Sequence, residues 1–294
     1  MKLNLKSVVE NRIASTNAAV DPLTAQVQFT GNTIGNPMAF YQQMDFSELD
    51  ESYSTLGAFI RHVAQGNCRG LILTGPPGVG KTSSVSSLLQ QYSTNSYKVI
   101  AGNVSPFNLY VELYRHRQPG EIIVLDDADS FLSTVEGINV VKAATDTISQ
   151  RQISWVTANP LLKAWNIEKS FKYNGAIILI SNERLGLHSK GRMALHLAAL
   201  TDRLRNLSIG ANNKEEQFYQ LCYYVVKHGL LRSRGLMPAQ EREILDYIAD
   251  HFDRLPRISL RTATNLAELM LLEPTEWKTM AKHSLLSLDK KEEI

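Results

Sequence analysis

The stretch Gly75-Pro76-Pro77-Gly78-Val79-Gly80-Lys81-Thr82 matches in full the phosphate-loop pattern G-x-x-x-x-G-K-S/T. It follows the apolar run 71–74, which predicts a buried strand, and precedes apolar residues at helical spacing over 85–92. Glycines let backbone N–H groups point inward, and a helix N-terminus carries partial positive charge, so this strand–loop–helix order suits phosphate. We expect Lys81 to reach the β- and γ-phosphates and Thr82 to ligate magnesium. The sequence therefore predicts ATP binding by Gly75, Pro76, Pro77, Gly78, Val79, Gly80, Lys81, Thr82 and Ser83.

A second part of the site is predicted where the apolar run 122–125 ends in Asp126 and Asp127. Ligands of open parallel sheets lie at the carboxyl ends of the strands, so these acids should lie near the phosphates. We expect Asp126 to hold Mg²⁺, often through water, and Asp127 to orient or deprotonate the attacking water. The alternative is that both acids merely end a strand or cap the next helix. For Asp129, helix capping explains the residue as well as a functional role does.

Short apolar runs alternate with segments of helical periodicity through the first two thirds of the chain. The strand-like runs cover 71–74, 97–101, 122–125 and 177–180, and residues 106–117 are expected to form one of the intervening helices. Strands that are apolar throughout indicate burial on both faces, and their alternation with helices indicates a parallel sheet. The predicted fold class is therefore α/β, a three-layer P-loop NTPase core with a parallel sheet.

The last third of the chain shows helical periodicity alone. Residues 214–229, 239–252 and 259–272 are predicted helices, with Pro238 suited to the first position of the second and Ser259 to the N-cap of the third. The core is thus expected to be followed by a small all-helical lid domain. The predicted divisions are an irregular N-terminal arm at 1–45, an α/β nucleotide-binding domain at 46–211, the helical lid domain at 212–275 and a loose C-terminal tail at 276–294.

The composition bounds the class of protein. Of 294 residues 44% are apolar, enough for a large core, and a net charge of +2 gives no global argument for nucleic-acid or membrane binding. No apolar run approaches the roughly 18 residues of a membrane span, and the N-terminus lacks the apolar stretch of a secretory signal. Cys68 and Cys222 lack metal-binding or redox spacing and fit free thiols in a reducing compartment. We expect a cytoplasmic protein with no membrane partner.

With these motifs in place, the sequence resembles the AAA+ family of ATPases over roughly residues 46–272. The Gly-Pro-Pro-Gly form of the loop is frequent in that family, and Asp126-Asp127 resembles its Walker B motif. Most members carry Asp-Glu there, and the shorter side chain of Asp127 reaches less far; a two-aspartate version also occurs in some replication-initiator relatives. The resemblance implies a P-loop core with a helical lid, ATP and Mg²⁺ as ligands, and ATP hydrolysis as the activity.

Two further segments resemble family elements that sense ATP within one subunit. Asn182 follows the run 177–180 as the sensor 1 residue does, which implies a hydrogen bond to the attacking water or the γ-phosphate; the alternative is an asparagine in a strand-end turn. The segment 257–262 is similar to sensor 2, in which a lid arginine touches the γ-phosphate. Arg261 is the candidate, and the alternative is an exposed helix arginine.

The segment 199–205 resembles the part of the family that carries the arginine finger. Such an arginine reaches into the ATP site of the neighbouring subunit and stabilises charge on the transferred phosphate. Arg203 is the first choice and Arg205 the second, against the alternative of a solvated or ion-paired arginine. The resemblance thus implies a homo-oligomer, most often a hexameric ring or spiral, with ATP sites at subunit interfaces.

Two segments bear on what such an ATPase acts on. The loop 103–107 falls where the family has pore loops, so Phe107 either grips an extended polypeptide or packs in the core. The insertion 149–175 interleaves aromatic and basic residues, which either bind single-stranded nucleic acid or form ordinary amphipathic packing. These residues are Trp155, Trp165, Phe171, Tyr173, Lys163, Lys169 and Lys172.

Three functions remain open at this point. The first is an AAA+ ATPase that remodels a protein or a protein–nucleic-acid complex. The second is a DNA-acting accessory ATPase, such as a helicase loader or a clamp-loader-like protein of replication or repair. The third is a nucleotide-dependent assembly scaffold with slow turnover, which the Asp126-Asp127 pair slightly favours. A protein partner is expected, and nucleic acid is a further candidate.

Overall fold

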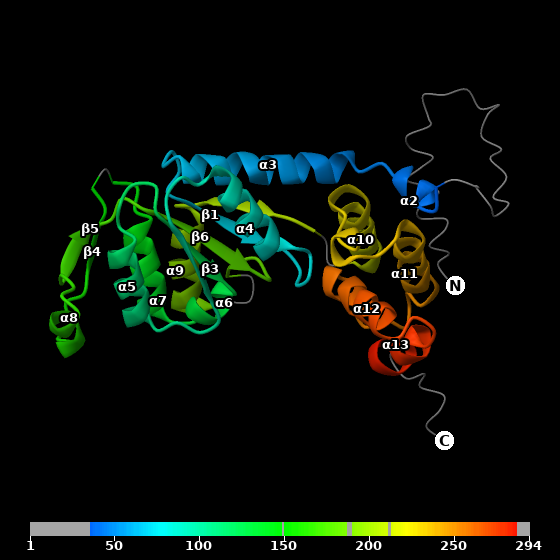
Figure 1. Cartoon of the computed structure of the whole chain (residues 1–294). Coiled ribbons are helices and arrows are strands. Elements are labelled where there is room, and N and C mark those ends of the chain that lie inside the picture. Colours follow the sequence, from blue (N-terminus) through cyan, green and yellow to red (C-terminus); the bar gives the residue numbers. More distant parts are fainter. Residues whose placement is uncertain (1–35, 149, 187–189, 211–212, 287–294) are drawn as a thin grey trace, which may run out of the picture. The chain divides into compact units, whose positions relative to one another are not determined.

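The computed structural model describes residues 36–148, 150–186, 190–210 and 213–286, without the side chains of Asp129, Ser130 and Arg192. The chain divides into two compact units: an α/β unit, Ser52–Ile209, and a helical unit, which joins Met1–Glu51 to Gly210–Ile294. Residues 1–35 of the predicted arm and 287–294 of the predicted tail lie outside the described residues. Figure 1 shows both units, with elements labelled where there is room.

The α/β unit is built on a five-stranded sheet in the order β2-β3-β6-β1-β7, in which every pairing is parallel. The register aligns Thr74 with Ser181 on one side of β1 and with Ser208 on the other. The carboxyl ends of these strands therefore share one edge of the sheet. The strands are β1 Gly70–Thr74, β2 Tyr97–Ala101, β3 Ile122–Asp126, β6 Ala176–Ser181 and β7 Arg205–Ser208.

Helices cover both faces of this sheet. Alternate residues of the central strands therefore enter two separate hydrophobic cores, one on each face. In β1, Ile72 joins one core while Leu71 and Leu73 join the other. The Ile72 core is closed by α5 Pro106–Arg115, α7 Val135–Ala144 and α9 Gly191–Thr201, and the other by α3 Ser47–Ala64 and α4 Lys81–Tyr92. The short helix α6 Ala128–Phe131 follows β3.

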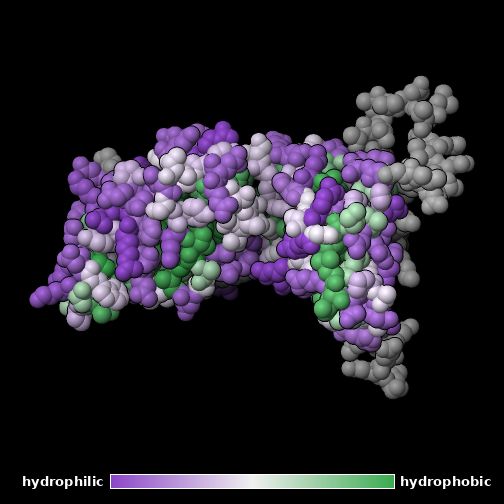
Figure 2. Space-filling model, in the orientation of Figure 1, coloured by the Kyte–Doolittle hydropathy of each residue, from purple (hydrophilic) through white to green (hydrophobic). Residues whose placement is uncertain are grey.

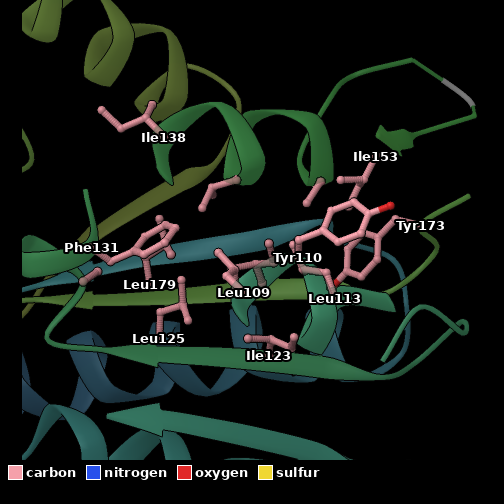
Figure 3. Close-up of a cluster of buried hydrophobic side chains, with 14 of the residues drawn as sticks. Leu109, Tyr110, Leu113, Ile123, Leu125, Phe131, Ile138, Ile153, Tyr173 and Leu179 are labelled. Atoms are coloured by element: carbon pink, nitrogen blue, oxygen red, sulfur yellow. The ribbon is translucent and has the colours of Figure 1, made fainter. Parts of the chain in front are cut away.

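Figure 3 shows side chains of the core that contains Ile72. Leu109, Tyr110 and Leu113 of α5 belong to this core together with Ile123 and Leu125 of β3, and all five are nearly or fully buried. Three layers, helix, sheet and helix, result. The predicted α/β fold class with a parallel sheet is confirmed.

An insertion between α7 and β6 forms a separate antiparallel hairpin. Its strands pair Ile153 with Phe171, and both side chains are buried. The outward-facing Ser154 and Ser170 hydroxyls hydrogen bond at 2.7 Å. The elements are β4 Gln152–Ser154, α8 Pro160–Ala164 and β5 Ser170–Lys172.

The helical unit contains each helix predicted in the last third of the chain. The Ser259 side chain accepts the Thr262 backbone N–H at 3.2 Å as the predicted N-cap, and Pro238 occupies the first turn of its helix. The elements of the unit are α2 Ala39–Gln42, α10 Lys214–His228, the 3-10 turn η2 Arg232–Arg234, α11 Pro238–Asp250, α12 Leu260–Leu272 and α13 Trp277–Leu285. The predicted helical region after the core is therefore confirmed.

The loose tail predicted from residue 276 is wrong over its first half, because α13 occupies Trp277–Leu285. Trp277 and Ala281 are buried, and the Trp277 ring lies 5.1 Å from that of Tyr247 on α11. Trp277, Ala281 and Leu285 recur at intervals of four residues, an amphipathic signal that the charged residues farther on obscured. Among the helices that are described, none combines the length and apolar character needed to cross a bilayer.

Candidate active site

The loop after β1 is held in place by a backbone contact that only glycine permits. A Cβ on Gly75 would lie 2.0 Å from the carbonyl oxygen of Ile209, and the Ile209 N–H donates to the Thr74 carbonyl at 2.9 Å. Gly78 and Gly80 have φ of 83° and 86°, in the left-handed region that glycine adopts without strain. The loop then enters α4 at Lys81, so the free N–H groups of the first helical turn face the loop.

Lys81 is buried and its ammonium is fully engaged. Nζ donates to the carbonyl oxygens of Gly75 at 2.7 Å and Pro76 at 2.9 Å, and to Oδ1 of Asn182 at 3.0 Å. These contacts fold the side chain back under the loop, where an anion cradled by the loop would meet a positive charge. Lys81 opens α4 after the loop that follows β1, and Asn182 directly follows β6, the neighbour of β1 in the sheet.

Thr82 and Asp126 meet across the same edge of the sheet. The Thr82 hydroxyl lies 3.0 Å from both Oδ1 and Oδ2 of Asp126, the last residue of β3. One hydroxyl and one carboxylate, next to a phosphate cradle, form the sparse oxygen set that Mg²⁺ accepts, because Mg²⁺ keeps several waters and takes further ligands from phosphate. The chemistry of these two residues therefore fits a magnesium ion.

Asp127 is exposed and turns away from the strand. Its φ of 57° and ψ of 48° place it in the left-handed region, uncommon for a residue with a side chain and tolerated best by Asn and Asp. Asn182 Nδ2 donates to Asp127 Oδ1 at 3.0 Å. Because Asn182 also accepts from Lys81, one amide bridges the buried ammonium and the exposed carboxylate. The side chain of Asp129 is outside the described part of the chain.

The two candidate arginine fingers lie at the opposite edge of the sheet. Arg205 opens β7 and pairs with Leu71 at the start of β1, whereas the phosphate loop follows the end of β1. Ile209, which meets Gly75, is four positions beyond Arg205, so at about 3.3 Å per residue the two edges lie roughly 13 Å apart. Arg203 is half-buried and donates to the Ala199 carbonyl at 3.1 Å, while Arg205 is exposed. Neither arginine is therefore brought to the phosphate loop of its own chain.

Arg261 belongs to the helical unit and lies in the first turn of α12, where it is exposed. Arg257, which precedes the Ser259 N-cap, is exposed as well. Both arginines are therefore exposed at the N-terminal end of one helix.

Most aromatic residues singled out between β2 and β6 serve the core. Phe107 packs against the rings of Trp155 and Trp165, with centroids 5.4 Å and 6.2 Å away, so the packing alternative holds for Phe107. Phe171 and Tyr173 are buried, whereas Trp165 is 46% exposed. The lysines of the insertion, Lys163, Lys169 and Lys172, are all exposed.

Three residues near the loop carried no sequence signal. The Tyr53 hydroxyl on α3 donates to the Val79 carbonyl at 3.3 Å, which ties that helix to the phosphate loop. Ser181 is buried and its hydroxyl bonds to the backbone of Glu183, which shapes the turn that presents Asn182. Ile209 is the third, through its contact with Gly75. Each residue acts through a contact between distant segments or through its backbone. Neither kind of contact leaves a periodic pattern in the sequence.

Residues 71–192 match the model of the ATPase family associated with various cellular activities (AAA). The match runs from β1 into α9, so it includes Lys81, Thr82, Asp126, Asp127 and Asn182. It ends before the candidate finger arginines and the helical unit.

A protein of Enterobacteria phage T4, an uncharacterized 36.7 kDa product of the nrdC–mobD intergenic region, is 28% identical over 262 residues, which is 87% of this chain and 80% of the phage protein. RuvB of Thermotoga maritima, a Holliday junction branch migration motor, gives a TM-score of 0.44 at 16% identity, over 79% of this chain and 68% of that chain. NtrX of Brucella abortus, in complex with ATP, gives 0.47 at 17% identity, over 75% of this chain and 49% of that chain.

Proposed function

The chain belongs, through its α/β unit, to the ATPase family associated with various cellular activities, and we propose that it hydrolyses ATP with magnesium at a site completed by a second copy of itself. The observation that carries the proposal is the meeting of Lys81, Thr82, Asp126, Asp127 and Asn182 at one sheet edge. Lys81 and Thr82 open α4 after the loop that follows β1, and the other three residues lie at the ends of β3 and β6; β1, β6 and β3 are adjacent in the sheet. This is the edge at which open α/β sheets bind ligands.

Each side chain has a task that its contacts support. Gly75–Ser83 cradles the phosphates through backbone N–H groups, and Lys81 neutralises the terminal ones. Thr82 and Asp126 hold Mg²⁺, which would neutralise charge on the phosphate oxygens. As water attacks the γ-phosphorus and the bond from that phosphorus to the ADP oxygen breaks, Asp127 accepts the proton of the water. Asn182 orients both Asp127 and that water. The exposure of Asp127 leaves room for water beside it.

The position of Arg203 and Arg205 supports catalysis in trans. Both lie at the edge remote from their own phosphate loop, so either of them would act on the transferred phosphate of a neighbouring copy rather than on that of its own chain. The arrangement is head to tail, which closes into a ring or winds into a spiral. We propose a homo-oligomer of this kind, with a hexamer as the expected ring.

We assign Arg261 to a second contact with the γ-phosphate, supplied by the helical unit. Its exposed place in the first turn of α12 leaves the guanidinium free for an anion. Arg257 offers the same charge before the helix and provides the comparison. Arg261→Ala should lower ATP turnover more than Arg257→Ala does; the reverse order would transfer the role to Arg257.

The function is tested by steady-state ATP turnover with Lys81→Ala as the decisive variant. Loss of the buried ammonium should abolish ATP binding or hydrolysis. Normal turnover in this variant would overturn the proposal. Arg203→Ala and Arg205→Ala should both bind ATP, and the variant that loses more turnover identifies the arginine finger. If the finger acts in trans, mixing that variant with Asp127→Asn should restore turnover.

We propose a protein or a protein–nucleic-acid complex as the target that ATP turnover remodels. The insertion favours this choice, because Val156 and Leu161 are exposed aliphatic side chains, 90% and 42%, of the kind that protein partners cover. Its three exposed lysines and Trp165 support the DNA-acting alternative, through phosphate contact and base stacking. Turnover measured without DNA, with single-stranded DNA and with duplex DNA separates the two. Stimulation by DNA that is lost in Trp165→Ala favours DNA, and indifference favours a protein target.

The scaffold alternative predicts a different result in the same assay. Assembly would depend on ATP, but turnover would stay low with every DNA. The Asp127 side chain, shorter than a glutamate, is the feature that favours this alternative. Asp127→Glu should then raise turnover without changing assembly.

A further inference from the structure

Tyr53 lies on the face of α3 that packs against the sheet. It repeats at helical spacing with Leu56, Ile60 and Val63, which are fully buried in the core that also contains Val79. The opposite face of the helix is mostly polar, and Figure 2 shows mostly hydrophilic surface over α3. The Tyr53 ring is half-buried against that core, so the packing of the helix fixes where the hydroxyl lies.

The Tyr53 hydroxyl reaches the middle of the phosphate loop, where it donates to the carbonyl of Val79 at 3.3 Å. Val79 stands between Gly78 and Gly80, two glycines in the left-handed region that give the backbone on either side its freedom. The Val79 side chain is 3% exposed. Val79 is therefore held twice, through its side chain by the core and through its carbonyl by Tyr53.

The carbonyl of Val79 and the N–H of Gly80 belong to one peptide unit. The described residues contain no cis peptide bond, so these two groups point in opposite directions. A carbonyl turned towards α3 therefore turns the Gly80 N–H away from that helix. The Gly80 carbonyl accepts the Ser84 N–H and the Ser83 hydroxyl at 2.9 Å each, whereas no oxygen of the described residues accepts the Gly80 N–H. That N–H is thus available to an anion in the loop.

We propose that Tyr53 is a positioning residue of the phosphate loop, whose hydroxyl orients the Val79–Gly80 peptide so that the Gly80 N–H points at the phosphates of ATP. The inference rests on the proposed function and adds a residue that lies outside both the loop and the segment 71–192. Tyr53 acts through a peptide unit and touches no phosphate. Its effect belongs to nucleotide binding, because the N–H meets phosphate in the bound state as well as during hydrolysis.

The test compares Tyr53→Phe with Tyr92→Phe. Tyr92 on α4 is half-buried against the same core, and its hydroxyl accepts from Arg61 Nη2 at 3.3 Å. Each substitution removes one hydroxyl and one hydrogen bond of equal length, and only the bond of Tyr53 reaches the loop. Tyr53→Phe should weaken the binding of ATP and ADP by about three- to tenfold, the factor that one ordinary hydrogen bond implies. Tyr92→Phe should match the unaltered chain.

Two further measurements separate positioning from other roles. In Tyr53→Phe, KM for ATP should rise by the same factor as Kd while kcat changes by less than about twofold, because a contact common to the ground state and the transition state is weakened. Inorganic tripolyphosphate, which carries phosphates without base or ribose, is tested as a competitor of ATP. Its affinity should fall by the same factor as that of ATP. Urea midpoints of both variants report any change in stability.

Three outcomes overturn the inference: equal ATP affinity in Tyr53→Phe and the unaltered chain, an equal loss in Tyr92→Phe, or a loss for ATP without a loss for tripolyphosphate. The first outcome, accompanied by a lower urea midpoint, would make Tyr53 structural only, and the third would place its hydroxyl against the nucleoside. Failure of the proposed function gives a different result. In that case the unaltered chain binds ATP without turning it over, while the binding measurements on the two tyrosine variants still decide the role of Tyr53.

Discussion

The hydroxyl of Thr82 lies 3.0 Å from each carboxylate oxygen of Asp126, although 44 positions separate the two residues in the chain. A hydroxyl and a carboxylate, held by different elements, can orient one magnesium ion. Their separation in sequence means that each is fixed by the sheet rather than by local structure. Loss of either should therefore affect magnesium use before it affects the fold.

Thr82→Val and Asp126→Asn should each lower magnesium-dependent ATP turnover by about a hundredfold or more, because they remove a metal ligand. ATP binding measured in EDTA should change by less than about threefold, a small fraction of the binding free energy. Ser87→Ala is the control, since Ser87 is exposed on the same helix and has no part in the site. Equal magnesium dependence in all three variants would remove the pair from the metal site.

Asn182 bridges Lys81 and Asp127 with one amide, accepting from the first and donating to the second at 3.0 Å each. Asn182→Ala should lower kcat by about a hundredfold, comparable to the loss of one preorganised hydrogen-bond donor, with a smaller change in KM. Asn182→Asp should be at least as damaging, because it places a carboxylate against Asp127.

Asn95→Ala is the matched control for Asn182→Ala, because it also removes one asparagine side-chain hydrogen bond. Asn95 donates to the Pro119 carbonyl at 3.1 Å from an exposed position that the proposed site does not use. Its removal should leave kcat unchanged and cost about 1 kcal/mol of stability at most. If Asn182→Ala altered only the free energy of unfolding, its role would be structural.

The sequence predicted what depends on local pattern. The phosphate loop is contiguous, and the buried strands are apolar throughout, so the fold class and the meeting of β1, β3 and β6 ends follow from general rules for parallel sheets. What it could not predict depends on contacts between distant segments. The approach of Ile209 to Gly75 and the bond from Tyr53 to Val79 need the folded register. The packing of Phe107 against Trp155 and Trp165 also required knowing how the insertion folds.

The two thiols should differ sharply in reactivity. Cys222 is fully buried on α10, and burial raises the pKa of its thiol, so little thiolate forms near neutral pH. Cys68 is half-buried in the turn before β1, and both cysteines are free of disulfide bonds. A chromogenic disulfide reagent at neutral pH should label one thiol quickly in the native protein and two in denaturant, with the second more than about a hundredfold slower in the native state. Cys68→Ser should abolish the fast phase; two fast thiols would contradict the burial of Cys222.

The last prediction concerns the close backbone contact between Gly75 and Ile209 at the phosphate loop. Gly75→Ala places a Cβ 2.0 Å from the Ile209 carbonyl, so β7 or the loop must move, at a cost of about 1–3 kcal/mol in stability and a large loss of ATP affinity. Gly57→Ala is the matched control, because its Cβ on α3 would meet Leu88 at 3.7 Å, an ordinary contact. That variant should be neutral or up to about 1 kcal/mol more stable, since alanine favours helix. Urea midpoints and ATP titrations measure both effects, and a Gly75→Ala protein that kept its stability and affinity would show that the loop does not need this contact.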